Sequence, residues 1–365
     1  MVMLADRLVK RSDAIRTEDL VRVYRILGRG FYDPGVFYEA LGSRFAYEVF
    51  MKALVKKVDV YALNGVNLTV REGEFVCMLG PNGSGKTTLI KILAGIIPPS
   101  SGRAEVMGYD VVRERKEVVK RVTYIPSLAA AGAWAQPRLT VRQNLRFMSK
   151  LFNFPFEDVL DAARKLGLEE VMDRPFGALS TGQQARVGLL FGILRRSPVY
   201  LLDEPTMGLS PEAARVLRNF LVDLNREFKV TVLYATHHPL EAQEVASRVV
   251  IMDRGRVVAD GAPEQLIRDS GLEESITLEV YGVYFDLRQA LQGLGANYVE
   301  IRPVRAEVGE YEVVVGVRDS DEALPKLLTE LLSRGAKVSR LRVRRANLED
   351  AYLYYVGAAR GGTGA

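Results

Sequence analysis

Residues 80–88 read Gly-Pro-Asn-Gly-Ser-Gly-Lys-Thr-Thr, and the segments on either side of them decide the fold. The apolar run at 75–79, Phe-Val-Cys-Met-Leu, is typical of a buried strand, and residues 88–94 have the apolar spacing of a helix. A strand, a glycine-rich loop and a helix in this order match the G-x-x-x-x-G-K-[ST] pattern. The backbone N–H groups of such a loop and the N-terminus of its helix attract an anion. The stretch therefore predicts that the chain binds a nucleoside triphosphate.

The candidate nucleotide-binding residues are those of the phosphate loop itself. Its lysine can reach the terminal phosphates, and the hydroxyl of the threonine after it is suited to coordinate Mg²⁺. The alternative is an ordinary glycine-rich turn before a helix. Such a turn would not require a strand, a lysine, a hydroxyl and a helix at the fixed spacing found here. The set comprises Gly80, Pro81, Asn82, Gly83, Ser84, Gly85, Lys86, Thr87 and Thr88.

A second apolar run, at 199–202, ends in Asp203-Glu204-Pro205-Thr206. A continuous apolar strand is typical of a buried parallel sheet, and acidic residues at its carboxyl end lie beside the phosphate loop in this kind of fold. Asp203 is expected to hold Mg²⁺ directly or through water. Glu204 is expected to orient or deprotonate the attacking water as the catalytic base. The alternative is a solvated Asp-Glu turn.

Composition limits the class of protein. The chain has 365 residues, 48% of them hydrophobic and 26% charged, as in a globular protein. No apolar stretch approaches the roughly 18–20 residues that span a bilayer, and residues 1–16 lack the apolar core of a secretory signal. Cys77 is the only cysteine, which excludes a disulfide framework and favours the cytoplasm. The net charge of +5 is mild and argues for neither nucleic acid nor lipid as a partner.

The order of expected elements predicts an α/β fold with a second, smaller domain. Strands are expected at 15–27 and 58–71, and the aromatic-rich stretch 28–57 between them reads as an amphipathic helical insertion. Strands and helices then alternate, which indicates layers around a parallel sheet. After a shift in composition near 269–271, the order β-α-β-β-α-β suggests a small α+β domain.

The segment Leu179-Ser180-Thr181-Gly182-Gln183-Gln184, shortly before Asp203, opens an expected helix. With the phosphate loop and the Asp-Glu-Pro-Thr strand, it makes residues 15–268 resemble the ATP-binding cassette (ABC) family. The resemblance implies a P-loop NTPase fold with a RecA-like core, an antiparallel β subdomain and a helical subdomain at 140–195. The remainder, 272–356, would be an accessory α+β domain. In the family, the residues matching Ser180, Thr181, Gly182 and Gln183 contact the ATP of the opposite subunit, so that a homodimer sandwiches two nucleotides.

Further positions match the family one by one. Thr236-His237 resembles the switch histidine that contacts the γ-phosphate, which makes His237 a second catalytic candidate, while His238 has the place of a helix-cap residue. Tyr24 is the candidate for stacking on adenine, with Tyr61 as the competitor because the insertion makes the alignment ambiguous. Gly208-Leu209-Ser210-Pro211 matches the loop at the dimer seam, with Ser210 where aspartate is usual.

The largest departure follows the strand at 122–125, where Ser127 stands at the place of the family's glutamine. Ser127 is a candidate to offer an oxygen to the Mg²⁺ shell, and Gln136 folding back is the alternative; neither follows from the sequence. In the family, this loop also receives the membrane partner. Trp134 is therefore a candidate docking residue, with packing on its own domain as the alternative.

The resemblance implies an ATP- and Mg²⁺-dependent ATPase that powers a separate integral membrane permease from the cytoplasmic face of the cell membrane. The segment Asn-Leu-Glu-Asp-Ala-Tyr-Leu at 347–353 and the insertion resemble the ABC-2 type exporter group. One alternative is a non-transport cassette acting on nucleic acid, but the chain has no heptads, cysteine pairs or second cassette, and we expect no nucleic-acid partner. The other is a regulatory cassette, suggested by Ser127 and Ser210. The cargo is not encoded in the chain.

Overall fold

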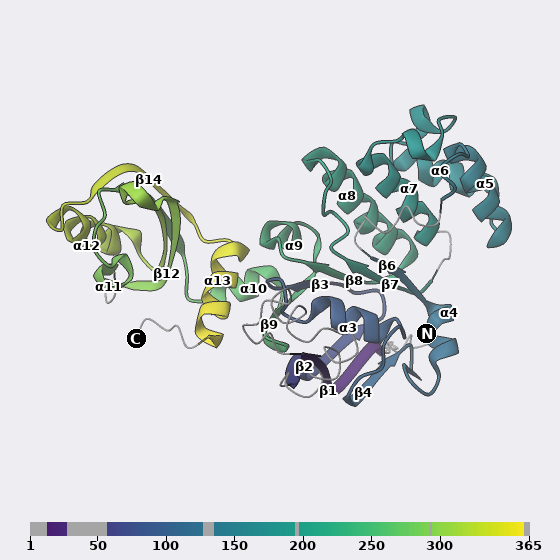
Figure 1. Ribbon diagram of the computed structural model, residues 1–365, viewed down its shortest axis with the longest axis horizontal. Coiled ribbons are helices and arrows are strands. Elements are labelled where there is room, and N and C mark those ends of the chain that lie inside the picture. The colour runs from purple at the N-terminus through teal and green to yellow at the C-terminus, as the bar shows by residue number, and fades with distance from the viewer. Residues whose placement is uncertain (1–12, 28–56, 127–134, 194–196, 292–293, 361–365) are drawn as a thin grey trace, which may run out of the picture.

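The computed structural model describes residues 13–27, 57–126, 135–193, 197–291 and 294–360. Figure 1 shows a larger α/β body and a smaller α+β body beside it, with helix α13 (Leu348–Ala359) between the two. Ser127, Trp134 and nearly all of the expected insertion at 28–57 lie outside the described residues.

A six-stranded sheet forms the centre of the larger body, in the order β10-β9-β3-β8-β7-β6. Its strands β3, β7 and β8 are buried at every position because helices or a second sheet cover both faces. All neighbouring pairs are parallel except the edge pair of β9 and β10. The strands are β3 (Phe75–Leu79), β6 (Val122–Ile125), β7 (Val199–Asp203), β8 (Thr231–Thr236), β9 (Arg248–Asp253) and β10 (Arg256–Gly261).

One face of the central sheet packs on α3 (Lys86–Leu93), which in turn is covered by an antiparallel sheet in the order β2-β1-β4-β5. Apolar side chains of both sheets and of α3 form one buried cluster there. The elements on this side are β1 (Asp13–Leu27), β2 (Lys57–Arg71), β4 (Ser101–Val106), β5 (Tyr109–Asp110) and α4 (Arg115–Arg121).

A second buried cluster covers the opposite face of the sheet. It includes a helical group, seen at the upper right of Figure 1, of α5 (Val141–Leu151), α6 (Phe156–Lys165) and α7 (Thr181–Ile193). Thr140 caps α5 in a capping box in which Gln143 N donates to Thr140 Oγ1 over 3.1 Å. The other helices of the larger body are α8 (Pro211–Phe228), α9 (Pro239–Val245) and α10 (Pro263–Asp269).

The smaller body is an antiparallel sheet in the order β12-β13-β11-β14, with two helices on one face. Its own apolar core joins the inner face of the sheet to α12. The elements are β11 (Glu274–Tyr281), α11 (Leu287–Leu291), β12 (Ala296–Arg305), β13 (Glu310–Val317), α12 (Ser320–Ser333) and β14 (Lys337–Arg345). Their order along the chain is the β-α-β-β-α-β order expected from the sequence.

Helix α13 connects the two bodies. Its Leu348 and Val356 belong to the apolar cluster of the larger body, and Leu348 N donates to Gln243 Oε1 of α9 over 2.9 Å. Its Asp350 accepts bonds from Arg344 and Tyr298 of the smaller body. Within the described ranges, none of the helices combines the length and apolar character that crossing a bilayer requires.

Candidate functional site

The phosphate loop joins the carboxyl end of β3 to the N-terminus of α3, and close packing requires its glycines. Gly85 is the N-cap of α3, with φ 106°, a conformation that side chains with a Cβ rarely adopt. A Cβ at Gly85 would collide with the carbonyl oxygen of Ala62, and one at Gly80 with that of Met252. The backbone can therefore curl into a cradle only with glycine at these two positions.

Two distant segments hold this loop from behind. The turn between β9 and β10 places Gly255 N 3.0 Å from Ser84 O, to which it donates. The carbonyl of Gly255 accepts from Asn64 N of β2 over 2.9 Å. The antiparallel sheet and the turn at Asp253-Arg254-Gly255 thus fix the shape of the phosphate loop.

Lys86 lies inside the loop that it ends. Its Nζ donates to Gly80 O (2.6 Å) and Pro81 O (3.1 Å) and lies 3.8 Å from Glu204 Oε1. Burial lowers the pKa of Lys86, and the carboxylates of Glu204 and Asp203 oppose that effect. The ammonium group is held at the loop, where a terminal phosphate would accept from it.

Thr87 and Asp203, the two predicted Mg²⁺ ligands, lie in contact. Thr87 Oγ1 donates to Asp203 Oδ1 over 3.0 Å. Burial raises the pKa of Asp203, against the lowering effect of Thr87, Lys91 and Lys86. A hydroxyl and a carboxylate are oxygen ligands of the kind Mg²⁺ prefers. The residues present therefore fit the metal.

Glu204 and His237 come together because β7 and β8 are neighbouring parallel strands. Glu204 Oε2 and His237 Nδ1 lie 2.8 Å apart. The backbone of Glu204 has φ 52°, in the left-handed region, and its N–H donates to Ala235 O of β8 over 3.0 Å. In the described part of the chain, the buried Glu204 Oε1 and Ser84 Oγ make no hydrogen bond, so both are available to a nucleotide and its attacking water.

The geometry favours His237 over His238. The two rings lie 3.9 Å apart, but the Glu204 contact is made by His237. His238 occupies the N-cap position of α9, where its side chain makes no capping bond and its backbone N donates to Thr236 Oγ1 over 3.0 Å.

The predicted signature lies at the exposed start of α7. Ser180 Oγ accepts from Gln183 N over 3.3 Å, and Gln183 Oε1 accepts from Ser180 N over 3.0 Å, which together form a local capping box. Gly182 lies beside Leu209 of the loop before α8. Helix α7 packs in the cluster on one face of the central sheet and α3 in the cluster on the other, so the signature is not part of the same cradle as Lys86.

Three further predicted positions are placed as follows. Ser210 is the N-cap of α8, and its Oγ accepts from Ala213 N over 3.3 Å, so serine can take the capping role that aspartate would have. Tyr24 lies opposite Val60 in the β1–β2 pair, and the Arg22 guanidinium lies 4.8 Å from its ring centroid. Tyr61 is 55% exposed and directly precedes Ala62 at the phosphate loop, so both tyrosines remain candidates.

In the described part of the chain, Gln136 makes no hydrogen bond to Asp203 or Thr87. Its backbone is held at the start of the helical group, where its N–H donates to Asn144 Oδ1 over 2.8 Å and its carbonyl accepts from Asn144 Nδ2 over 3.1 Å. Its side chain is exposed.

Sequence reasoning missed the residues that support the site from other elements. Ala62, Asn64 and Gly255 shape the phosphate loop, and Glu241 of α9 contacts the strands that carry Glu204 and His237. The Asp-Arg-Gly turn was recognisable from sequence as a turn, but nothing in it indicates the loop that it contacts. Glu241 follows His237 by four residues, which is the spacing of any two neighbours on one face of a helix. The sequence alone therefore does not mark Glu241 as part of the site.

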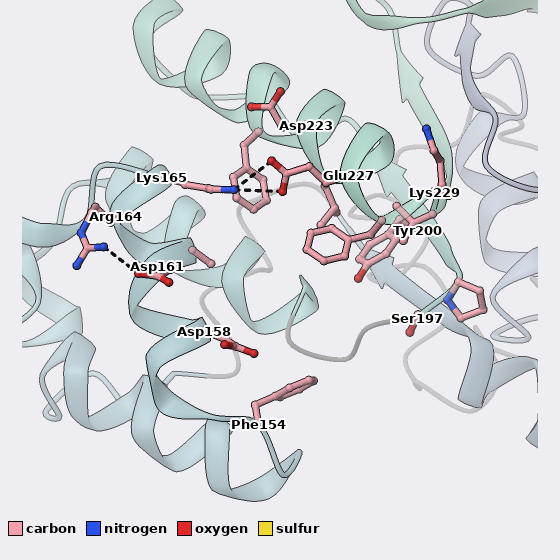
Figure 2. Close-up of a pocket in the computed structure, with 16 residues that line it drawn as sticks. Phe154, Asp158, Asp161, Arg164, Lys165, Ser197, Tyr200, Asp223, Glu227 and Lys229 are labelled. Carbon is pink, nitrogen blue, oxygen red and sulfur yellow. Dashed lines mark hydrogen bonds and ion pairs between the residues drawn. The ribbon is translucent and has the colours of Figure 1, made fainter.

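Figure 2 shows a separate cavity of about 870 Å³ between α6 and α8. Its lining includes Pro198 and Tyr200 at the start of β7 and Val230 just before β8, so it lies at the amino end of the strands. The Lys165–Glu227 ion pair, 3.2 Å, spans it. The site described above is built at the carboxyl end of the same strands, and the cavity contains none of its residues.

Comparison with known proteins identifies relatives along most of the chain. The family model described as ABC transporter matches residues 63–207. The Nod factor export ATP-binding protein I of Ralstonia nicotianae is 30% identical over 302 residues, which cover 81% of this chain and 89% of that protein. The sulfate/thiosulfate import ATP-binding protein CysA of Bradyrhizobium diazoefficiens is 36% identical over 229 residues, covering 59% of this chain and 64% of that protein.

Among solved structures, the fold is similar to the dimeric post-hydrolysis state of the ATP-binding cassette MJ0796 bound to ADP and Pi. The TM-score is 0.52 at 22% identity, and the match covers 68% of this chain and 98% of that one. At this identity the likeness shows the fold, and it confirms the fold class predicted for the larger body.

Proposed function

Because the chain belongs to the family of ABC transporter ATP-binding proteins, which hydrolyse ATP, we propose that it powers an exporter of the ABC-2 type through a separate membrane permease. The extent of the match supports this assignment most. The alignment with the Nod factor export protein covers 81% of the chain, more than the larger body contains, so it reaches into the smaller body. The alignment with the import protein CysA covers 59%.

In the proposed reaction, the chain's own residues position the nucleotide and the water. The phosphate loop and Lys86 bind the phosphates, and Glu204, held by His237, accepts the proton of the attacking water. Thr87 and Asp203 would hold Mg²⁺, which when bound neutralises charge on the phosphates. The phosphate loop, the residues that end β7 and the histidine that follows β8 all meet in one place, which favours an active ATPase over the regulatory alternative.

The active unit is proposed to be a homodimer. The signature at α7 is exposed and is a cradle of its own, separate from the phosphate loop, which suits a contact with ATP bound to a second copy. MJ0796 was solved as a dimer with ADP and Pi. The Glu204→Gln variant, studied by light scattering with saturating Mg·ATP, should change from monomer to dimer. A variant that stays monomeric would refute the shared site.

The partner is proposed to be an integral membrane permease, with this chain peripheral on the inner face of the cell membrane. Affinity purification of the tagged full-length chain from detergent-solubilised native membranes should recover an integral membrane protein in stoichiometric amount. Recovery of RNA or ribosomal proteins in its place would contradict the transport function.

Direction of transport needs a separate experiment. The chain and its copurified permease are reconstituted in vesicles that display the chain on the outside, and these are incubated with Mg·ATP and a cell extract. For an exporter, compounds from the extract accumulate inside the vesicles, as detected by mass spectrometry. ATP-dependent release of vesicle contents would mean import and would refute the exporter assignment. Vesicles carrying Glu204→Gln are the matched control.

A further inference from the structure

Glu241 of α9 is a meeting point of three buried hydroxyl groups. Its Oε2 accepts from Thr206 Oγ1 (2.9 Å), from Tyr234 OH (3.1 Å) and from Thr236 Oγ1 (3.4 Å). All three donors are nearly inaccessible to solvent, with exposures of 6%, 0% and 0% in that order. Thr206 Oγ1 and Tyr234 OH also lie 3.3 Å from each other, and Glu241 Oε2 is the one acceptor that all three hydroxyls share. A buried hydroxyl that loses its acceptor is costly, so removal of this carboxylate would disturb all three groups.

The other oxygen of Glu241 pairs with a cation from a neighbouring helix. Arg218 Nη1 of α8 lies 3.1 Å from Glu241 Oε1, and the arginine is 12% exposed. The same arginine also reaches Glu244, one turn further along α9, over 2.7 Å. Glu244 is 45% exposed and contacts only Arg218 among the residues of this network. Both carboxylates of α9 thus pair with Arg218. Only Glu241 also accepts hydrogen bonds from the turn after β7 and from the end of β8.

Two of the donors that Glu241 holds lie close to the catalytic pair in sequence, one in the turn after β7 and one at the end of β8. Thr206 comes two residues after Glu204, and Thr236 directly precedes His237. The Thr236 hydroxyl also accepts from His238 N over 3.0 Å, which holds the chain on the other side of His237. Met207 N donates to Glu204 O over 3.1 Å, closing the turn that contains Thr206.

We propose that Glu241 is a positioning residue for ATP hydrolysis, which keeps Glu204 and His237 at their 2.8 Å contact by joining the turn after β7 to the end of β8. A charged acceptor makes stronger hydrogen bonds than a neutral one, so the carboxylate stabilises this arrangement more than an amide would. A reacting pair needs such outer support to hold its productive geometry. The inference rests on ATP hydrolysis by the chain.

The test compares steady-state ATP hydrolysis by the parent with three single variants of the full-length chain. Glu241→Ala should lower kcat by roughly tenfold or more and leave the KM for ATP within about twofold, because Glu241 does not touch the nucleotide cradle. Glu241→Gln keeps the shape of the side chain and one acceptor oxygen, so its kcat should lie between those of Glu241→Ala and the parent. It also serves as the control for a folding defect in Glu241→Ala. Glu244→Ala, which removes the other Arg218 partner, should keep kcat within about twofold of the parent.

A double variant distinguishes positioning from general destabilisation. If Glu241 acts through His237, then Glu241→Ala should add little to the loss already caused by His237→Ala. Full additivity of the two losses would overturn the proposal. So would a kcat of Glu241→Ala equal to that of the parent, or equal losses in Glu241→Ala and Glu244→Ala. Absence of hydrolysis by the parent itself would instead refute the ATPase function.

Discussion

Two helix N-termini of this chain are suited to phosphate, at α3 and at α7, and the fold surrounds them to different degrees. At α3, Ser84 and Lys86 are 1% and 5% exposed, and β2 and the β9–β10 turn hold the loop in shape. At α7, Ser180 and Thr181 are exposed, and the capping box is made within the segment itself. The first is a complete cradle built by one chain, and the second has the features of a half-site that a partner completes.

The largest expected effect comes from the chemistry at the first cradle. Glu204→Gln keeps the shape of the side chain and removes the base, so ATP hydrolysis should fall by roughly a thousandfold while ATP binding is retained. Phosphate release and equilibrium nucleotide binding measure the two effects separately. Glu212→Gln, at an exposed position in the first turn of α8, is the matched control and should hydrolyse ATP like the parent. Equal rates for Glu204→Gln and the control would remove Glu204 from its role.

A pair of glycine substitutions tests the comparison directly. Gly85→Ala places a Cβ against Ala62 O at φ 106°, so ATP binding should weaken by more than about tenfold in the single chain. At Gly182, a Cβ meets Leu209 at an ordinary 3.6 Å, so Gly182→Ala should fold and bind ATP normally but lose dimer-dependent hydrolysis. If Gly182→Ala binds ATP as poorly as Gly85→Ala, the two cradles are not separate in the way proposed.

Mixing two inactive variants sharpens the half-site interpretation. Lys86→Ala lacks the first cradle and Gly182→Asp lacks the second, so neither should hydrolyse ATP alone. In an equal mixture, half of the dimers pair one copy of each and contain one intact site of two. The mixture should then recover about a quarter of the parent activity, measured as phosphate release. No recovery under conditions in which the mixed dimer forms would contradict sharing of the site.

The smallest expected effect concerns the attachment of α13. Burial acts to raise the pKa of Asp350, but bonds from Arg344, Tyr298 and Asn347 N outweigh it and the pKa is lowered overall. A lowered pKa in the folded state means that Asp350 stabilises the fold above the unfolded value of about 3.9 and loses this effect as the pH falls through the folded value.

Asp350→Asn should therefore lower the unfolding temperature at pH 7, with a cost of about 2 kcal/mol, the size of a hydrogen bond to a charged group. The difference from the parent should shrink as the pH falls below about 4. Thermal unfolding followed by circular dichroism across this pH range measures both. A difference that is the same at pH 7 and at the lowest pH would show that the charge of Asp350 is not what holds α13.

The local sequence pattern predicted the buried, regular elements and missed the elements that are short or largely exposed. The strands β3, β6 and β7 follow from apolar runs in the sequence, and their bounds differ from the expected 75–79, 122–125 and 199–202 by at most one residue. The strand β4 was missed because its first three residues are exposed and it has no clear alternation. The short β5, α4 and α10 carry too few apolar residues to stand out.

For the site, the amino-acid order alone determined the phosphate loop, because the loop's strand, glycines, lysine and helix are covalent neighbours with fixed spacing. It also determined that Asp203 and Glu204 end a buried strand. Only the tertiary structure decided which residues meet. The order of strands in the sheet brings His237 to Glu204, and packing between remote segments brings Ala62 and Gly255 to the phosphate loop and Glu241 to Thr206. Contacts between residues so distant in sequence depend on how the layers pack, and no local pattern encodes them.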